Sequence, residues 1–463
     1  MKLSFHGAAQ GVTGSCHLLQ CAGKSILVDC GLYQGSRELV EENANDFGFD
    51  PAEVDYLLLT HAHLDHCGRI PLLVNRGFRG EIITTAASRE LARLVMMDAA
   101  GLQEEEARYR NRRAHRRGRR GEETVPLYTV LDALNALENF GRTAVYGQTL
   151  QLTPELRATF IDAGHILGSA CILLEADEHG HRRRILFSGD LGMQGRPILR
   201  DPAQPPPADV VVMETTYGDR PHKELEPSVA ELYDAINTTT RRGGNVVIPT
   251  FALERAQEIL YYLHAGKEQG KLPEFLQVFL DSPMAISATQ IFRRHPECYD
   301  SQTSALFSSG GDPFDFTGLH FTRETAESMA INQINGGAVI MAGSGMCTGG
   351  RVRHHLKHNL GRERSSIVFV GYAARGTLAR QIIDGAANVT IFGEDYAVRA
   401  EIFTIGGFSA HAGQQELLRW HRATGNPDVT FLVHGEKDSM SAFGRLLGAA
   451  RVETPELHQS FEL

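Results

Sequence analysis

The chain has 463 residues, which is too long for one ordinary hydrophobic core and predicts at least two domains. Its 42% hydrophobic and 22% charged residues exclude a disordered chain, and its net charge of −10 excludes a uniformly polycationic nucleic-acid binder, though not a local basic surface. No run of about 18 apolar residues predicts a membrane helix, and seven scattered cysteines without a CxxC pair favour a reducing compartment. We therefore expect a cytoplasmic protein that is neither exported nor membrane-spanning.

Short apolar runs recur along the chain and predict buried strands, as in SILVDCG, YLLLTHAH, RRILFSGDLG, DVVVMETTYG and NVVIPTF. Helical patterns lie between some of them, over residues 88–102 and 254–264, so we expect mixed α/β layers. Polar residues follow the trailing ends of the runs, where open α/β sheets carry their sites. These residues are Asp29, His61, Asp190, Glu214, His411 and His434.

The segment THAHLDHCG, residues 60–68, crowds three imidazoles and a carboxylate behind one predicted strand. His61 and His63 can point to the same side of an extended backbone, while Asp65 and His66 reach a second point, so one short turn can serve two metal ions. Imidazole and carboxylate ligands without thiolate suit a catalytic zinc, and less specifically manganese or iron. The alternative is a polar loop with solvated histidines, which this ligand spacing disfavours.

Two segments have a biased amino-acid composition, one rich in arginine and one rich in proline. Residues 108–120, RYRNRRAHRRGRR, hold eight arginines, which we interpret as a solvated loop or helix extension. Residues 201–208, DPAQPPPA, predict a stiff linker and a domain boundary nearby.

The HxHxDH turn resembles the signature of the metallo-β-lactamase superfamily. Its companion residues are identifiable as Asp29 in ILVDCG, His165 in DAGHILGSA and Asp190 in FSGDLG. The resemblance implies that His61, His63 and His165 hold one metal, that Asp65 and His66 hold the other, and that Asp190 bridges them, with Asp29 orienting the ligands. Two such metals activate water and neutralise charge on a phosphoryl or carbonyl oxygen, so the implied reaction is hydrolysis.

The rest of the chain resembles the β-CASP subfamily of nucleases. Its three further motifs match Glu214 in VVMETTYGDR, His411 in GGFSAHAG and His434 in FLVHGE. The resemblance spans essentially the whole chain and departs from the usual pattern in small ways, such as Ala379 in place of glycine. It implies an α/β fold, an αββα sandwich (residues 1–210 and 396–463) into which an α/β β-CASP cap domain (residues 211–395) is inserted.

The three motifs also imply roles. His434 would complete the second metal's ligands, and a histidine at this position favours RNA over DNA in this family. His411 would donate a proton to the departing 3′ oxygen or hold the scissile phosphate. Glu214 would hydrogen-bond either His434 or His411, so that Asp65, His411, Glu214 and Asp29 form the expected catalytic set.

A phosphodiester chain also needs sites for its other phosphates. The glycine-rich segment GSGMCTGGR, residues 343–351, predicts a backbone cradle for anions, although an ordinary loop is an alternative. The expected phosphate-binding residues are Arg255, Ser344, Thr348, Arg351 and Arg375. In this context the arginine-rich segment could rim an RNA channel.

We therefore expect a cytoplasmic ribonuclease that processes or degrades single-stranded RNA with two Zn²⁺ ions, Mn²⁺ being the alternative metal. The sequence leaves open endonuclease or 5′→3′ exonuclease action, and a homodimer or a monomer. It predicts no membrane partner. The rival functions are a DNA nuclease of the same family, a small-molecule ester or thioester hydrolase, and a scaffold that binds RNA without cleaving it.

Overall fold

The computed structural model describes residues 1–35, 37–116, 123–371, 373–374, 376–448 and 451–463. The chain forms two compact units. Unit 1 comprises residues 1–194, 201–221 and 411–463, and unit 2 comprises residues 195–200 and 222–410. No helix among the described residues is long and apolar enough to cross a membrane.

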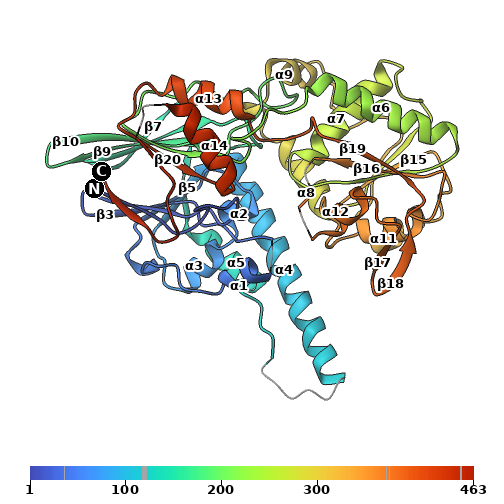
Figure 1. Cartoon of the computed structure of the whole chain (residues 1–463), viewed down its shortest axis with the longest axis horizontal. Helices are drawn as coiled ribbons and strands as arrows, with labels where there is room; N and C mark the ends of the chain where they lie inside the picture. Colours follow the sequence, from blue (N-terminus) through green and yellow to red (C-terminus); the bar gives the residue numbers. More distant parts are fainter. Residues whose placement is uncertain (36, 117–122, 372, 375, 449–450) are drawn as a thin grey trace. The chain divides into compact units, whose positions relative to one another are not determined.

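Unit 1 is built on two seven-stranded mixed sheets that stack face to face (Figure 1). In spatial order the first sheet contains β22 (Ser460–Glu462), β1 (Lys2–Phe5), β2 (His17–Cys21), β3 (Lys24–Val28), β4 (Tyr56–Leu58), β5 (Glu81–Thr85) and β6 (Phe140–Ala144). The second contains β21 (Val452–Glu453), β20 (Val429–Val433), β11 (Val210–Glu214), β10 (His181–Phe187), β9 (Ala170–Glu178), β8 (Leu156–Asp162) and β7 (Thr149–Thr153).

Helices cover the outer faces of both sheets, as the αββα expectation required (Figure 1). Beside the first sheet lie α1 (Arg37–Glu42), α2 (Leu64–Cys67), α3 (Ile70–Asn75), α4 (Ala86–Arg116) and α5 (Val130–Ala136), and over the second lie α13 (Gln414–Ala423) and α14 (Lys437–Leu447). The core between the sheets is fully apolar at positions such as Phe5, Ile26, Phe160 and Phe187. Burial of these side chains stabilises the sandwich and fixes the strand ends that carry the site.

Unit 2 has its own six-stranded sheet, in which all neighbouring strands are parallel. Its order is β14 (Leu319–Phe321), β13 (Gln277–Leu280), β15 (Ala338–Ala342), β12 (Val246–Pro249), β16 (Ser366–Val370) and β19 (Glu401–Ile405), with a separate ribbon of β17 (Asn388–Ile391) and β18 (Glu394–Ala397). Its helices are α6 (Leu225–Arg241), α7 (Arg255–Glu268), α8 (Pro283–Phe292), α9 (Ser301–Ser308), α10 (Thr325–Ile331), α11 (Val352–Asn359) and α12 (Leu378–Ile383).

The division between the units falls later than the sequence analysis expected. A boundary after residue 210 would separate β11 from β10 and β20, with which it pairs in parallel in unit 1. A boundary after residue 395 would cut β18 and separate β19 from its partner β16 in unit 2. Strand pairing therefore moves the boundaries to 221/222 and 410/411. Residues 201–208, the expected linker, contain no helix or strand and belong to unit 1.

Candidate metal centre

The HxHxDH segment lies just beyond the end of β4. His61 follows this strand, His63 has extended dihedral angles (φ −66°, ψ 150°), and α2 begins at the next residue, so that Asp65 and His66 lie in the first helical turn. The backbone here packs closely against Gly31, where a Cβ would lie 1.6 Å from the carbonyl oxygen of Asp65. Only glycine fits this approach, which brings the loop after β3 against the ligand segment.

One group of possible metal ligands contains His61, His63, His165 and Asp190. The Nδ1 atom of His63 lies 3.1 Å from Nε2 of His61 and 3.2 Å from Nε2 of His165. The Oδ2 atom of Asp190 is 3.4 Å from Nε2 of His61 and 3.5 Å from Nε2 of His165. Two segments of the chain about 100 positions apart thus direct four donor atoms to one point.

A second group, Asp65, His66 and His434, lies beside the first. The Nε2 atom of His434 is 3.3 Å from Nε2 of His66 and 3.4 Å from Oδ2 of Asp65. Nε2 of His66 is also 3.4 Å from Oδ2 of Asp190, the same oxygen that belongs to the first group. Asp190 is therefore placed to be shared between the two groups.

These donor sets fit a divalent metal. Zinc–nitrogen bonds of about 2.0–2.1 Å in a tetrahedron put neighbouring donors roughly 3.3–3.4 Å apart, close to the separations found here. Burial lowers the pKa of both His61 and His63 to about 4, so both imidazoles are neutral at pH 7, as metal ligands must be. Asp190 Oδ1 is buried and lies 3.4 Å from Nδ1 of His434, but it accepts no hydrogen bond from the described residues. A bound cation would satisfy such an oxygen.

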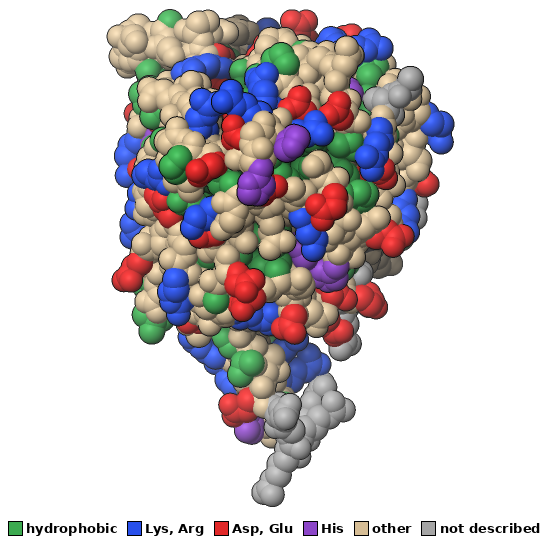
Figure 2. Space-filling model, turned by 90° about the vertical axis from the view of Figure 1, so that its left-hand side faces the viewer, with side chains coloured by type: hydrophobic (Ala, Val, Ile, Leu, Met, Phe, Trp, Pro, Cys, Tyr) green, Lys and Arg blue, Asp and Glu red, His purple; other side chains and the backbone are tan. Residues whose placement is uncertain are grey.

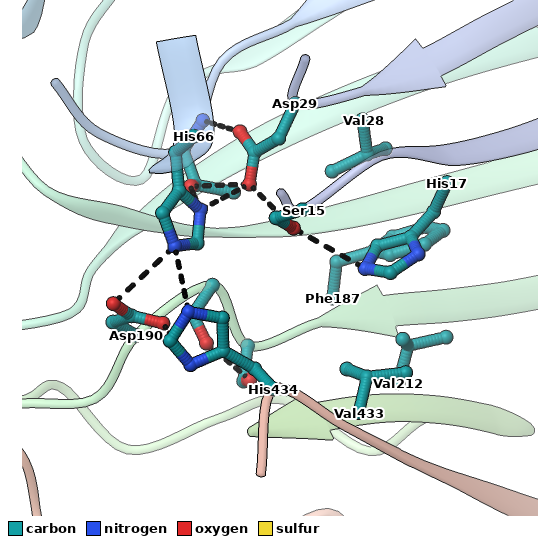
Figure 3. A pocket seen from close by; sticks show the side chains of 13 residues that line it. Ser15, His17, Val28, Asp29, His66, Phe187, Asp190, Val212, Val433 and His434 are labelled. Atoms are coloured by element: carbon teal, nitrogen blue, oxygen red, sulfur yellow. Dashed lines mark hydrogen bonds and ion pairs between the residues drawn. The ribbon is translucent and has the colours of Figure 1, made fainter. Parts of the chain in front are cut away.

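Asp29 orients one of the ligands from behind (Figure 3). Its Oδ2 lies 2.7 Å from Nδ1 of His66, and its Oδ1 accepts a 2.8 Å hydrogen bond from the backbone N–H of Thr60. If Nδ1 of His66 carries the proton, Nε2 is left as the free donor that faces Asp190 and His434. The hydroxyl of Thr60 adds a bond to Asp29 Oδ2 (2.8 Å) and lies 3.0 Å from Nδ1 of His61.

The position of the His434 side chain depends on the backbone conformation of this residue and on a contact with a threonine. It follows β20 with a left-handed backbone (φ 49°), which is uncommon for residues other than glycine and turns its imidazole toward the second ligand group. The hydroxyl of Thr216 lies 3.1 Å from Nδ1 of His434. Sequence reasoning missed both Thr60 and Thr216, although each adjoins a motif residue, Thr60 before the HxHxDH turn and Thr216 two positions after Glu214.

Glu214 hydrogen-bonds to His411, and its carboxylate also lies within 4.8 Å of donor atoms of His434 and Asp190, which makes these three residues a further group of possible ligands. Its side chain is fully buried, and its Oε1 accepts a hydrogen bond from the backbone N–H of Leu191 (2.7 Å) and lies 3.2 Å from Nδ1 of His411. Burial opposes protonation of His411, but the Glu214 carboxylate outweighs it and raises the pKa of His411 to about 9. The His411 ring lies beside the cluster, 4.5 Å between centroids from His165.

Two of the unit 2 arginines that were expected to bind phosphate contact acidic and carbonyl groups of the protein itself. Arg255 forms an ion pair with the buried Glu258, and Arg351 donates to Asp281 (2.7 Å) and to the carbonyls of Thr322 and Arg323. In the glycine-rich loop the hydroxyls of Ser344 and Thr348 lie 3.4 Å apart, and Thr348 is exposed. Arg375 lies outside the described residues.

Comparison with known proteins decides the family. The model of the metallo-β-lactamase superfamily matches residues 9–145, that of the Beta-Casp domain residues 256–382, and that of the Zn-dependent metallo-hydrolase RNA specificity domain residues 395–455. Ribonuclease TTHA0252 of Thermus thermophilus is 42% identical over 448 residues, which cover 96% of each chain. The chain belongs to the β-CASP family of the metallo-β-lactamase superfamily.

Other similar proteins are more distant. Transcription termination factor FttA of Methanocaldococcus jannaschii is 31% identical over 454 residues, covering 96% of this chain and 68% of that protein. A crystal structure of a protein of unknown function from Enterococcus faecalis matches the whole chain with a TM-score of 0.54 at 12% identity and supports the fold alone. The metal-dependent hydrolase fold and the inserted β-CASP domain are therefore confirmed.

Proposed function

We propose that this β-CASP protein is a ribonuclease that hydrolyses phosphodiester bonds of single-stranded RNA in the cytoplasm. The observation that carries the proposal is the pair of ligand groups that share Asp190 Oδ2. The ribonuclease from Thermus thermophilus that is 42% identical supports RNA as the substrate. The seven free cysteines, all buried, support a reducing compartment.

Two Zn²⁺ ions, or Mn²⁺, would be held by these groups. His61, His63 and His165 would bind one ion, Asp65, His66 and His434 the other, and Asp190 both. Bound metal would lower the pKa of water toward 7 and neutralise the charge that develops on the phosphoryl oxygens.

The remaining residues would position protons. Asp29, which accepts a hydrogen bond from Thr60, would keep the proton of His66 on Nδ1, and Thr216 would hold the His434 ring through Nδ1. His411, held by Glu214, would donate a proton to the 3′ oxygen that leaves, or bind the scissile phosphate. The products would carry a 5′ phosphate and a 3′ hydroxyl. A homodimer stays a prediction.

A time course on single-stranded RNA with a 5′ label tests the proposal. Metal-loaded protein should release internal fragments or a 5′ mononucleotide, and matched DNA should be cleaved more slowly. His63→Ala should abolish cleavage, while His181→Ala, an exposed histidine at the start of β10, should not change it. Intact RNA in the presence of metal-loaded protein, or RNA cleaved equally well by His63→Ala, would contradict the proposal.

A further inference from the structure

The last turns of α4 extend beyond the packed part of unit 1. Ala107 is the last buried residue of this helix, which continues to Arg116 with exposed side chains, among them Tyr109 at 57% exposure. In Figure 2 the lower, projecting part of the view shows basic side chains together with acidic and histidine ones, and α4 itself contains arginines but no lysine. An isolated helical end of this kind gains little from its own chain, so its exposed surface is available to a partner.

One side of this helical end is occupied by the chain that returns from it. Asn111 exchanges two hydrogen bonds with the backbone of Thr124, and Gln103 accepts one from the N–H of Leu127. A helix turns about 100° per residue, so Tyr109, Arg112, Arg113 and Arg116 fall on the opposite side. We call these four residues the arginine face. All four are exposed.

The charges of the arginine face are unbalanced. Several other exposed arginines of unit 1 have acidic partners, as in Arg142–Glu81 (2.7 Å), Arg157–Glu175 (3.3 Å) and Arg182–Asp177 (2.9 Å). Within the described part of the chain, no carboxylate lies within ion-pair distance of Arg112, Arg113 or Arg116. Adjacent guanidinium groups repel one another, and in a chain of net charge −10 they mark a surface suited to a polyanion.

Helix α4 links this face to the metal centre. At its other end, the hydroxyls of Thr85 and Ser88 donate to the carbonyl of Gly168, in the loop that carries His165. At 1.5 Å per residue, the 24 positions from Ser88 to Arg112 span roughly 36 Å along the helix axis. At about 3.4 Å per nucleotide of a stacked helical strand, this distance corresponds to about ten nucleotides, and an extended single strand covers it with fewer.

We propose that the arginine face is an accessory RNA-binding surface, which holds the phosphate backbone of the substrate at most about ten nucleotides from the bond that is cleaved. The inference rests on the proposed ribonuclease function. The three guanidinium groups bind phosphates without regard to sequence, and the exposed ring of Tyr109 offers a base a stacking surface. The surface therefore favours long substrates over short ones.

The test compares two RNA lengths. The triple variant Arg112→Gln, Arg113→Gln, Arg116→Gln removes the charge while keeping good helix-forming residues, which circular dichroism verifies. We expect kcat/KM for a 30-nucleotide RNA to fall about tenfold at low salt, and its slope against log salt to become shallower by about 2, since each single-strand phosphate contact contributes roughly 0.7. A four-nucleotide RNA, too short to reach the face, should be cleaved as by the wild type.

A matched control removes three charges elsewhere. Arg157→Gln, Arg182→Gln, Arg183→Gln changes arginines near the starts of β8 and β10, at the ends of these strands away from His165 and Asp190. It should leave both rates unchanged. An unchanged rate and salt slope for the triple variant on the long RNA, an equal loss in the control, or an equal loss on the short RNA would each overturn the inference.

Two further outcomes are informative. If the triple variant cleaves long RNA normally but no longer binds vesicles that contain phosphatidylserine, the face binds anionic lipid and the inference is wrong. If the wild type cleaves neither RNA, the proposed ribonuclease function is wrong, and this inference falls with it.

Discussion

The metal centre of unit 1 and the glycine-rich loop of unit 2 were both expected to bind substrate or metal, and they differ in how their polar groups are used. In the metal centre, the donor atoms of six motif residues and Asp190 converge and leave Asp190 Oδ1 without a hydrogen-bond donor among the described residues. Beside the loop, Arg351 already donates to one carboxylate and two carbonyls. Donor atoms that converge on one point suit a ligand, whereas an arginine whose hydrogen bonds are satisfied by the protein is first of all part of the fold.

The largest effect should follow from loss of a central ligand. His63→Ala removes the Nδ1 atom that lies between His61 and His165, and should lower kcat/KM for RNA by a factor of about 10³ or more, as loss of electrostatic stabilisation at a reacting centre does. The melting temperature should stay near that of the wild type, because His63 is only half-buried. Residual activity above a tenth of the wild-type value would mean that His63 is not a ligand.

His411→Ala should lower kcat by a factor of about 10² to 10⁴, the usual contribution of a positioned acid or base. Metal content should not change, because His411 belongs to neither ligand group. Glu214→Gln should give a smaller loss of the same kind, since it weakens the bond to His411 Nδ1 but keeps the residue's shape. Single-turnover cleavage together with metal analysis separates a role in proton transfer or phosphate binding from a role in metal binding. Loss of metal in either variant would refute the role proposed for that residue.

Asp29→Ala should weaken metal binding by a factor of about 10 to 100, because the bond that orients His66 is lost. Competition with a chelator measures this without any reference to RNA cleavage. Asp50→Ala is a suitable control, since Asp50 is exposed and caps a short helical turn. Equal chelator sensitivity of Asp29→Ala and the wild type would show that His66 needs no such support.

The smallest effect should come from the unit 2 arginine. Arg351→Gln should lower the free energy of unfolding by about 2 kcal/mol, the scale of a hydrogen bond to a charged group, because buried Asp281 loses one of its donors. His355 and Ser328 still donate to Asp281, at 2.6 Å each, which limits the loss. Chemical denaturation measures it. A raised KM for RNA with unchanged stability would instead make Arg351 a phosphate-binding residue.

The side chains that the sequence analysis expected to bind metal lie together in the structure, because they belong to compact motifs. Asp29, the HxHxDH turn, Asp190 and His434 each end an apolar strand, and strand ends meet at one edge of a sandwich. The domain boundaries were harder to predict. In the structure, β11 pairs with β10 and β20 of unit 1. Its amino-acid sequence would be equally compatible with a first strand of the inserted domain, because the sequence of a strand does not specify its pairing partners.

The ion-pair partners of the arginines were also difficult to predict from the sequence. The sequence around Arg351 does not reveal that Asp281 neutralises it, since the pair joins residues 70 positions apart. The partner of Arg255 could have been expected, because Glu258 follows three positions later on the same helix. The arginine-rich segment shows the reverse case. The sequence allowed a helix extension, and the structure confirms one up to Arg116 and leaves Arg112, Arg113 and Arg116 without carboxylate partners among the described residues.

Titration of zinc into metal-free protein, followed by calorimetry and by metal analysis after dialysis, tests the central claim most directly. The wild type should bind two ions per chain. His434→Ala and His165→Ala should each retain one, because each removes a donor from a different ligand group. Binding of a single ion by the wild type, or two ions retained by both variants, would contradict a centre built from two groups that share Asp190.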